Sequence, residues 1–130
     1  MSQKPLWVPS DVIISTHEEL VNRFGGSQGI RDEGMLESAL NRPKHLFQYE
    51  SADHYQLAAS LAHGLVKNHP FIDGNIPLAF LAAVLFIERN GLRFQSDEVE
   101  VVERTLALAA SAITEKDYAD WLEKSCQNSK

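Results

Sequence analysis

The sequence is poor in the residues that mark secreted, membrane or nucleic-acid-binding proteins. Its 130 residues include one cysteine, Cys126, which excludes an internal disulfide and favours a reducing compartment. Lysine and arginine number 12 against 18 acidic residues, so the formal charge is −6, and no basic cluster suited to phosphate contacts is present. The longest apolar run, Ile76–Ile87, is shorter than the roughly 20 residues that a membrane span needs. We therefore expect a cytoplasmic protein that binds neither nucleic acid nor membrane directly.

The chain also lacks internal repeats, low-complexity tracts and linkers rich in proline, glycine or serine. Its length and its hydrophobic content of 44% are sufficient for one buried core. We predict a single domain over residues 1–130.

Apolar residues recur at intervals of three and four positions, which predicts an all-α fold. The first helix is expected to have Ser10 or Asp11 as its N-cap and to end at Gly25. A short second helix is expected to end before Pro43, because proline lacks a backbone N–H. Four more helices are predicted over residues 53–67, 77–90, 97–112 and 114–124.

The segment Pro77–Asn90 is apolar on nearly every side, which is typical of a helix surrounded by its neighbours. We therefore predict a compact helical bundle around this buried central helix. Short β pieces remain possible in Gly25–Gly34 and around Leu92–Phe94.

A polar, turn-rich segment, His69–Asn75, separates the third helix from the apolar one. Histidine titrates near neutral pH and can accept a proton, Asp73 can position a metal ion or a hydroxyl, and a helix beginning after Gly74 directs free N–H groups at an anion. This combination suits phosphoryl or nucleotidyl transfer. The same residues also fit an ordinary turn capped by His69 and Asn75, and spacing alone leaves both interpretations open.

The letters HPFIDGN resemble the first seven positions of the Fic/Doc signature HPFxDGNKR, which runs on into a buried helix. The resemblance covers most of the chain. It includes RFGGSQGIRDEGMLESALNRP, LAASLAHGLVKNHPFIDGN and AFLAAVLFIERNGLRF, in the order found in the Doc, or death-on-curing, branch. The chain is thus similar to Doc toxins, which implies a Fic/Doc helical domain with a flap over the active site.

The resemblance implies a role for each residue of the motif. His69 matches the general base, Phe71 the residue that anchors the loop, and Asp73 the acidic residue that serves Mg²⁺ or substrate positioning, while Gly74 and Asn75 match the start of the phosphate-binding turn. ATP and Mg²⁺ are the cofactors implied. Doc members are expected to transfer the γ-phosphate to a threonine of elongation factor Tu and to bind a cognate antitoxin, whereas Fic members usually transfer AMP to a protein hydroxyl.

The motif departs from the family where Lys-Arg is expected, because Ile76-Pro77-Leu78 stands there. Both cations that would clamp nucleotide phosphates are absent, and proline also removes a backbone N–H. We expect a Doc-type transferase with impaired activity. The alternatives are a catalytically silent Fic/Doc fold that acts by binding proteins, and a Fic-type AMP transferase. Rescue by other cations would have to come from Arg31, Arg42, Lys44 or Lys67.

Two other polar stretches are predicted to be solvated helical faces. His17-Glu18-Glu19 begins like a zinc-protease motif, but Val21 stands where the second histidine is required. The acidic residues of 97–103 are expected on the wet side of a helix, with a basic partner as the alternative.

Overall fold

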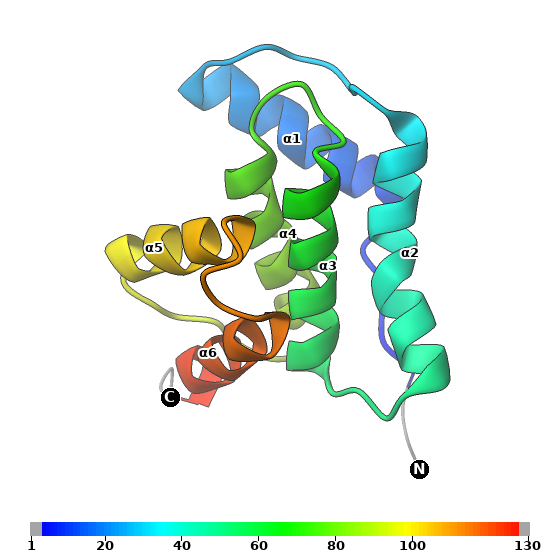
Figure 1. Ribbon diagram of the computed structural model, residues 1–130, viewed down its shortest axis with the longest axis vertical. Helices are drawn as coiled ribbons and strands as arrows, with labels where there is room; N and C mark the ends of the chain where they lie inside the picture. The colour runs from blue at the N-terminus through cyan, green and yellow to red at the C-terminus, as the bar shows by residue number, and fades with distance from the viewer. Residues whose placement is uncertain (1–3, 128–130) are drawn as a thin grey trace.

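The computed structural model describes residues 4–127 and consists of six helices (Figure 1). The helices are α1 (Ser10–Phe24), α2 (Glu33–Tyr49), α3 (His54–Asn68), α4 (Asn75–Arg89), α5 (Glu98–Ala109) and α6 (Glu115–Gln127). The all-α prediction is confirmed. Within residues 4–127 the only β feature is one isolated antiparallel bridge, between Ile30 and Phe71. No helix in this range is long and apolar enough to cross a bilayer.

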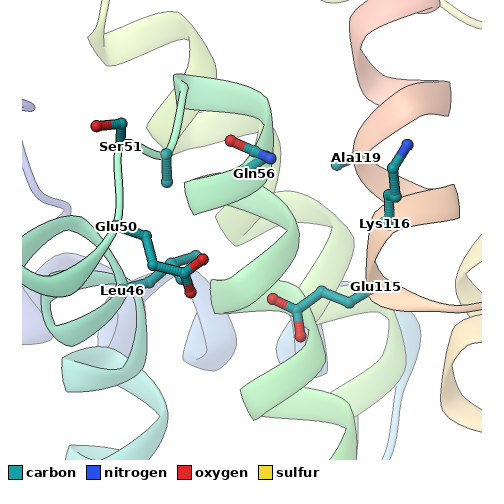
Figure 2. Close-up of a pocket in the computed structure, with 8 residues that line it drawn as sticks. Leu46, Glu50, Ser51, Gln56, Glu115, Lys116 and Ala119 are labelled. Atoms are coloured by element: carbon teal, nitrogen blue, oxygen red, sulfur yellow. The ribbon is translucent and has the colours of Figure 1, made fainter.

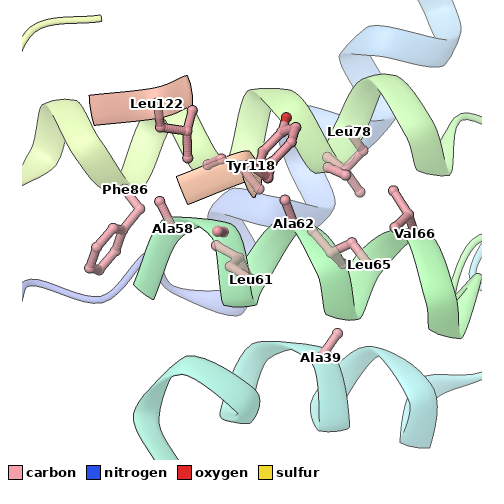
Figure 3. Packing of buried hydrophobic residues seen from close by; sticks show 14 of the residues in the cluster. Ala39, Ala58, Leu61, Ala62, Leu65, Val66, Leu78, Phe86, Tyr118 and Leu122 are labelled. Atoms are coloured by element: carbon pink, nitrogen blue, oxygen red, sulfur yellow. The ribbon is translucent and has the colours of Figure 1, made fainter. Parts of the chain in front are cut away.

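The centre of the bundle is shared by α3 and α4. Figure 3 shows the side chains of α3 lying between Ala39 of α2 on one side and Leu78 and Tyr118, from α4 and α6, on the other. The predicted central helix is observed as α4, and α3 is also buried over most of its middle turns, from Leu57 to Val66. These apolar contacts provide most of the driving force for folding.

Helix α2 does not end before Pro43, so that prediction was wrong. Pro43 lies inside the helix and leaves the carbonyl of Ala39 without its usual N–H partner. The helix continues because its last turns are needed for packing. Leu46 and Phe47 pack against the core, and the ring of Phe47 lies 6.1 Å from that of Trp7. Apolar burial after Pro43 therefore offsets the lost hydrogen bond.

Capping explains where several of the helices begin. Asp53 and Gln56 form a reciprocal capping box before α3, and Thr114 and Asp117 form another before α6. The predicted cap of α1 was wrong. Ser10 is already helical and follows Pro9, whose carbonyl accepts the first backbone hydrogen bonds.

Gly64 is the point of closest approach between α2 and α3. A Cβ atom at Gly64 would lie 3.1 Å from the Cα of Ala39.

We expect Gly64→Leu to lower the free energy of unfolding by about 2 kcal/mol or more, because the added side chain must push the two helices apart. Urea unfolding measures this change. Ser38→Leu, at an exposed position of α2, is the control and should change stability by less than about 0.5 kcal/mol. Equal effects of the two substitutions would contradict the close contact.

Candidate functional site

The predicted motif forms the connection between α3 and α4. His69 is exposed directly after the end of α3 and adopts a left-handed conformation with φ of 47°, while its N–H donates to the carbonyl of Leu65. Gly74 also has a positive φ, 79°, directly before α4. A left-handed conformation costs a non-glycine residue about 1 kcal/mol, so other contacts must hold His69 in place. The two turns bring the start of α4 beside the end of α3.

The side chain of Asn75 supplies the central contacts of the loop. Its Oδ1 accepts a hydrogen bond from the N–H of Phe71 at 3.0 Å, and its Nδ2 donates to the carbonyl of Phe71 at 2.9 Å. Asn75 therefore pairs with the Phe71 backbone as a neighbouring strand would, and both residues are buried. The same Nδ2 lies 3.4 Å from Nδ1 of His69. The Asn75 amide thus organises the loop from inside, and its backbone N–H lies in the first turn of α4.

His17 lies under this loop, which the sequence analysis missed. Its side chain is 2% exposed, so the prediction of a solvated face was wrong for this residue. The imidazole stacks on the ring of Phe71 at 3.8 Å and 17°, and its Nε2 donates to the carbonyl of Asp73 at 2.6 Å. A signal was available, because His17 lies four positions after Ile13 and three before Leu20, on the apolar side of α1.

The glycine of the motif is favoured by its backbone conformation, a positive φ of 79°. A Cβ atom at Gly74 would lie 3.4 Å from Val21 and 3.5 Å from Nε2 of His17, in addition to the strain of a positive φ. Gly74 therefore serves the turn into α4 by its φ, while the contacts that a Cβ atom would make with α1 are of ordinary length.

Residues 25–32, which we call the flap, cover the other side of the loop. The N–H of Ser27 donates to Oδ2 of Asp73 at 2.8 Å, and the N–H of Ile72 donates to the carbonyl of Gly29 at 3.1 Å. Gly26 permits this approach, since a Cβ atom there would lie 3.3 Å from that of Asp73. Asp73 is exposed, but one of its carboxylate oxygens is already bonded to the flap.

Ile76 and Pro77 occupy the first turn of α4, half-buried and exposed respectively. The side chain of Arg31, in the flap, is hydrogen-bonded to the end of α3 and the start of the loop. Its Nε donates to the carbonyl of His69 at 2.6 Å and its Nη2 to the carbonyl of Asn68 at 2.8 Å. The guanidinium thus caps the end of α3, where a positive charge stabilises the helix.

The other candidate cations have roles elsewhere in the bundle. Arg42 pairs with Glu115 at 2.8 Å and also donates to the carbonyl and hydroxyl of Ser60. Lys67 donates to the carbonyl of Ala109, at the end of α5, and to the hydroxyl of Ser111. Lys44 lies along the hollow between the N-terminal segment and α2.

The hollow drawn in Figure 2 lies away from the loop, between the end of α2 and the start of α6. Its volume is about 290 Å³, and the carboxylates of Glu50 and Glu115 face each other across it. None of the residues lining it belongs to the segment 69–75. Glu115 is also held by Arg42, and the described residues contain no group of three or more histidine, cysteine, aspartate or glutamate side chains suited to a metal ion.

The contacts of His17 make a testable prediction. We expect His17→Phe to lower the free energy of unfolding by about 1 to 3 kcal/mol, because an aromatic ring remains on Phe71 while the Asp73 carbonyl loses its donor. Urea unfolding measures the loss, and amide hydrogen exchange at Ser27 should become faster. His45→Phe, an exposed histidine on α2, is the matched control. If stability and hydrogen exchange are unchanged in His17→Phe, the hydrogen bond from His17 to the Asp73 carbonyl does not hold the loop in place.

Comparison of the sequence with known proteins indicates the family. The chain is 28% identical to the protein kinase doc of Escherichia phage P1 over 118 residues, which are 90% of this chain and 93% of that protein. It is 36% identical to the toxin Doc of Mycolicibacterium smegmatis over 78 residues, 57% of this chain and 58% of that protein. The model of the Fic/DOC family matches residues 7–87, which span α1 to α3, the loop and most of α4. The chain therefore belongs to the Fic/DOC family.

Proposed function

We propose that the chain is a toxin of the Doc kind that pairs with an antitoxin. We further propose that its ancestral activity is ATP-dependent phosphoryl transfer to a threonine hydroxyl of elongation factor Tu. One relative is named a protein kinase and another a toxin, which supports both parts. The observation that carries the proposal is the motif loop His69–Asn75, which is present in full with His69 exposed at its start. Ile76 and Pro77, which follow the loop, stand in place of the Lys-Arg of the family motif.

His69 is the residue that we propose to take the proton of the target hydroxyl. His69 is exposed, and its Nδ1 lies 3.4 Å from Nδ2 of Asn75, so Nε2 is the ring nitrogen open to a hydroxyl outside the loop. To take the hydroxyl proton at Nε2, the neutral ring must carry its own proton on Nδ1. The Asn75 side chain and the Arg31 guanidinium hold the backbone on both sides of His69, which fixes where the ring can lie. Asp73 keeps Oδ1 for a metal ion or a hydroxyl, because its hydrogen bond to the flap uses Oδ2.

We propose that the site as it stands binds the phosphates of ATP poorly, although Asp73 is still available to a metal ion. Phosphates at the start of α4 would meet Ile76 and Pro77, which offer neither charge nor, at Pro77, an N–H donor. Arg31 and Lys67 are committed to carbonyl groups of the bundle. Removing a group that stabilises transition-state charge lowers a rate by about two to three powers of ten, so we propose that transfer by this chain is strongly impaired.

The same observation favours a second candidate, a catalytically silent Fic/Doc fold that acts by binding proteins. The contacts of His17, Asn75 and the flap are all intact, so loss of the cations leaves the fold and its surfaces in place. A silent fold would still engage an antitoxin.

Labelled ATP distinguishes these candidates. We expect the double substitution Ile76→Lys with Pro77→Arg to transfer label from the γ-phosphate to elongation factor Tu, at a rate at least about 100-fold above that of the unaltered chain. Adding His69→Ala to the double substitution should abolish transfer, because the base is lost. Scintillation counting of the isolated elongation factor measures the label, and a parallel reaction with label at the α-phosphate detects AMP transfer.

Each result has a clear meaning for the proposal. Equal γ transfer by the unaltered and doubly substituted chains would refute the impairment. Transfer of the α label would refute phosphoryl transfer in favour of AMP transfer. Absence of transfer by all versions would refute this activity on elongation factor Tu and favour the silent fold.

Nucleotide binding is tested separately by thermal unfolding. A ligand that binds only the folded state raises the midpoint temperature, so Mg-ATP should raise the midpoint of the doubly substituted chain and leave that of the unaltered chain nearly unchanged. Mg²⁺ without nucleotide is the control. A similar upward shift for both chains would contradict the loss of the phosphate clamp.

A further inference from the structure

Helix α5 carries a stripe of exposed apolar side chains, which we call the α5 stripe. It consists of Val99, Val102 and Leu106, exposed to 62%, 55% and 48%. These residues are three and four positions apart and therefore lie on one side of the helix. Single exposed apolar residues are common on proteins, but several together on one face mark an interaction surface.

The stripe is not needed to hold α5 on the bundle. The opposite side of the helix performs that task, with Leu108 fully buried and Thr105 bonded through its hydroxyl to the hydroxyl of Tyr118 at 2.9 Å. Val101 also packs against the core. In Figure 1 α5 lies on the side of the bundle away from α2. The α5 stripe thus remains open to a partner after the fold is complete.

An apolar hollow of about 420 Å³ adjoins the stripe. Phe80 and Phe94 line it, with ring centroids 5.4 Å apart in an edge-to-face arrangement. The rest of the lining is Val101 and Val102 with the polar residues Gln95, Ser96 and Glu98. Val102 belongs to both the hollow and the stripe. A side chain of a partner that extends past the stripe would therefore contact Phe80 and Phe94 in the hollow. Anchor residues of protein interfaces fill pockets in this way.

Acidic side chains border the α5 stripe on both edges. Residues 95–127 contain eight acidic and three basic side chains, so they carry five of the six net negative charges of the chain. Glu98 lies one turn before Val102 on one edge of the stripe, and Glu103 lies one turn before Leu106 on the other. Both are exposed and form no ion pair within residues 4–127, whereas Glu100 pairs with Arg104 at 3.7 Å.

We propose that the α5 stripe docks an amphipathic helix of a partner protein whose apolar side is bordered by lysine or arginine. Spacing by three and four residues suits a helical partner, which presents its own side chains at the same intervals. The uncompensated Glu98 and Glu103 select a basic partner over an acidic one. They also disfavour a second copy of this chain, because two facing stripes would bring four glutamates together. The proposal is independent of the motif loop and of any nucleotide.

The probe is a synthetic amphipathic helical peptide with leucine at every third or fourth position and lysine beside the leucines, and its control replaces each lysine with glutamate. Fluorescence anisotropy measures the affinity of each for the full chain at low and high salt. We expect binding of the lysine peptide alone, weakened by salt. Val102→Ser with Leu106→Ser should weaken it about tenfold or more, because such anchors carry most of an interface's binding energy.

Two further variants complete the test. Glu98→Gln with Glu103→Gln should weaken the lysine peptide and reduce its salt dependence, while keeping the stripe. Phe24→Ser with Tyr49→Ser removes apolar side chains that are exposed elsewhere and should leave binding unchanged. Circular dichroism during heating confirms that each variant is folded.

Four results would overturn the proposal. They are failure of the lysine peptide to bind, equal binding of the glutamate peptide, unchanged affinity in Val102→Ser with Leu106→Ser, or an equal loss in Phe24→Ser with Tyr49→Ser. A dimer in size-exclusion chromatography that disappears in Val102→Ser with Leu106→Ser would show that a second copy occupies the stripe, and would overturn it as well.

Discussion

The loop between α3 and α4 depends on the two hydrogen bonds that the Asn75 side chain makes with the backbone of Phe71. A loop pressed between buried helices must satisfy its backbone N–H and carbonyl groups without water, and Asn75 does so for the residue that enters the core. His17 continues this arrangement from below, by stacking on Phe71 and donating to Asp73. The left-handed turn at His69 is stable because these contacts hold the chain on its far side.

The impairment proposed for the site depends on charge rather than on shape. The loop, the flap and α1 are joined by hydrogen bonds, and this arrangement does not involve the side chains of Ile76 or Pro77. Proline is also tolerated in the first turn of a helix, where an N–H has no intrahelical partner. Under the proposed function, Ile76 and Pro77 would therefore weaken the hold on phosphate while the bundle keeps its fold. The loop and the α5 stripe are separate surfaces, so a chain without transferase activity would retain a face for protein partners.

Sequence reasoning went wrong where tertiary packing overrules a local rule. Pro43 was expected to end a helix, but the turn after it buries Leu46 and Phe47, and that burial compensates for the missing hydrogen bond. His17 was expected in solvent because it stands beside two glutamates. Its spacing from Ile13 places it instead on the buried face of α1, where a polar ring is stable only with a partner such as the Asp73 carbonyl.

The sequence alone determined the all-α class, the approximate positions of six helices and the Fic/Doc motif, because these depend on periodicity, capping residues and a short specific string of letters. It also revealed the loss of both cations, since a missing charge is visible without coordinates. Only the tertiary structure decided that the Asn75 amide faces the loop interior, that Arg31 caps α3 rather than facing the start of α4, and that one side of α5 is left uncovered. These features depend on contacts between residues far apart in the chain, and a single sequence carries no direct record of such distances.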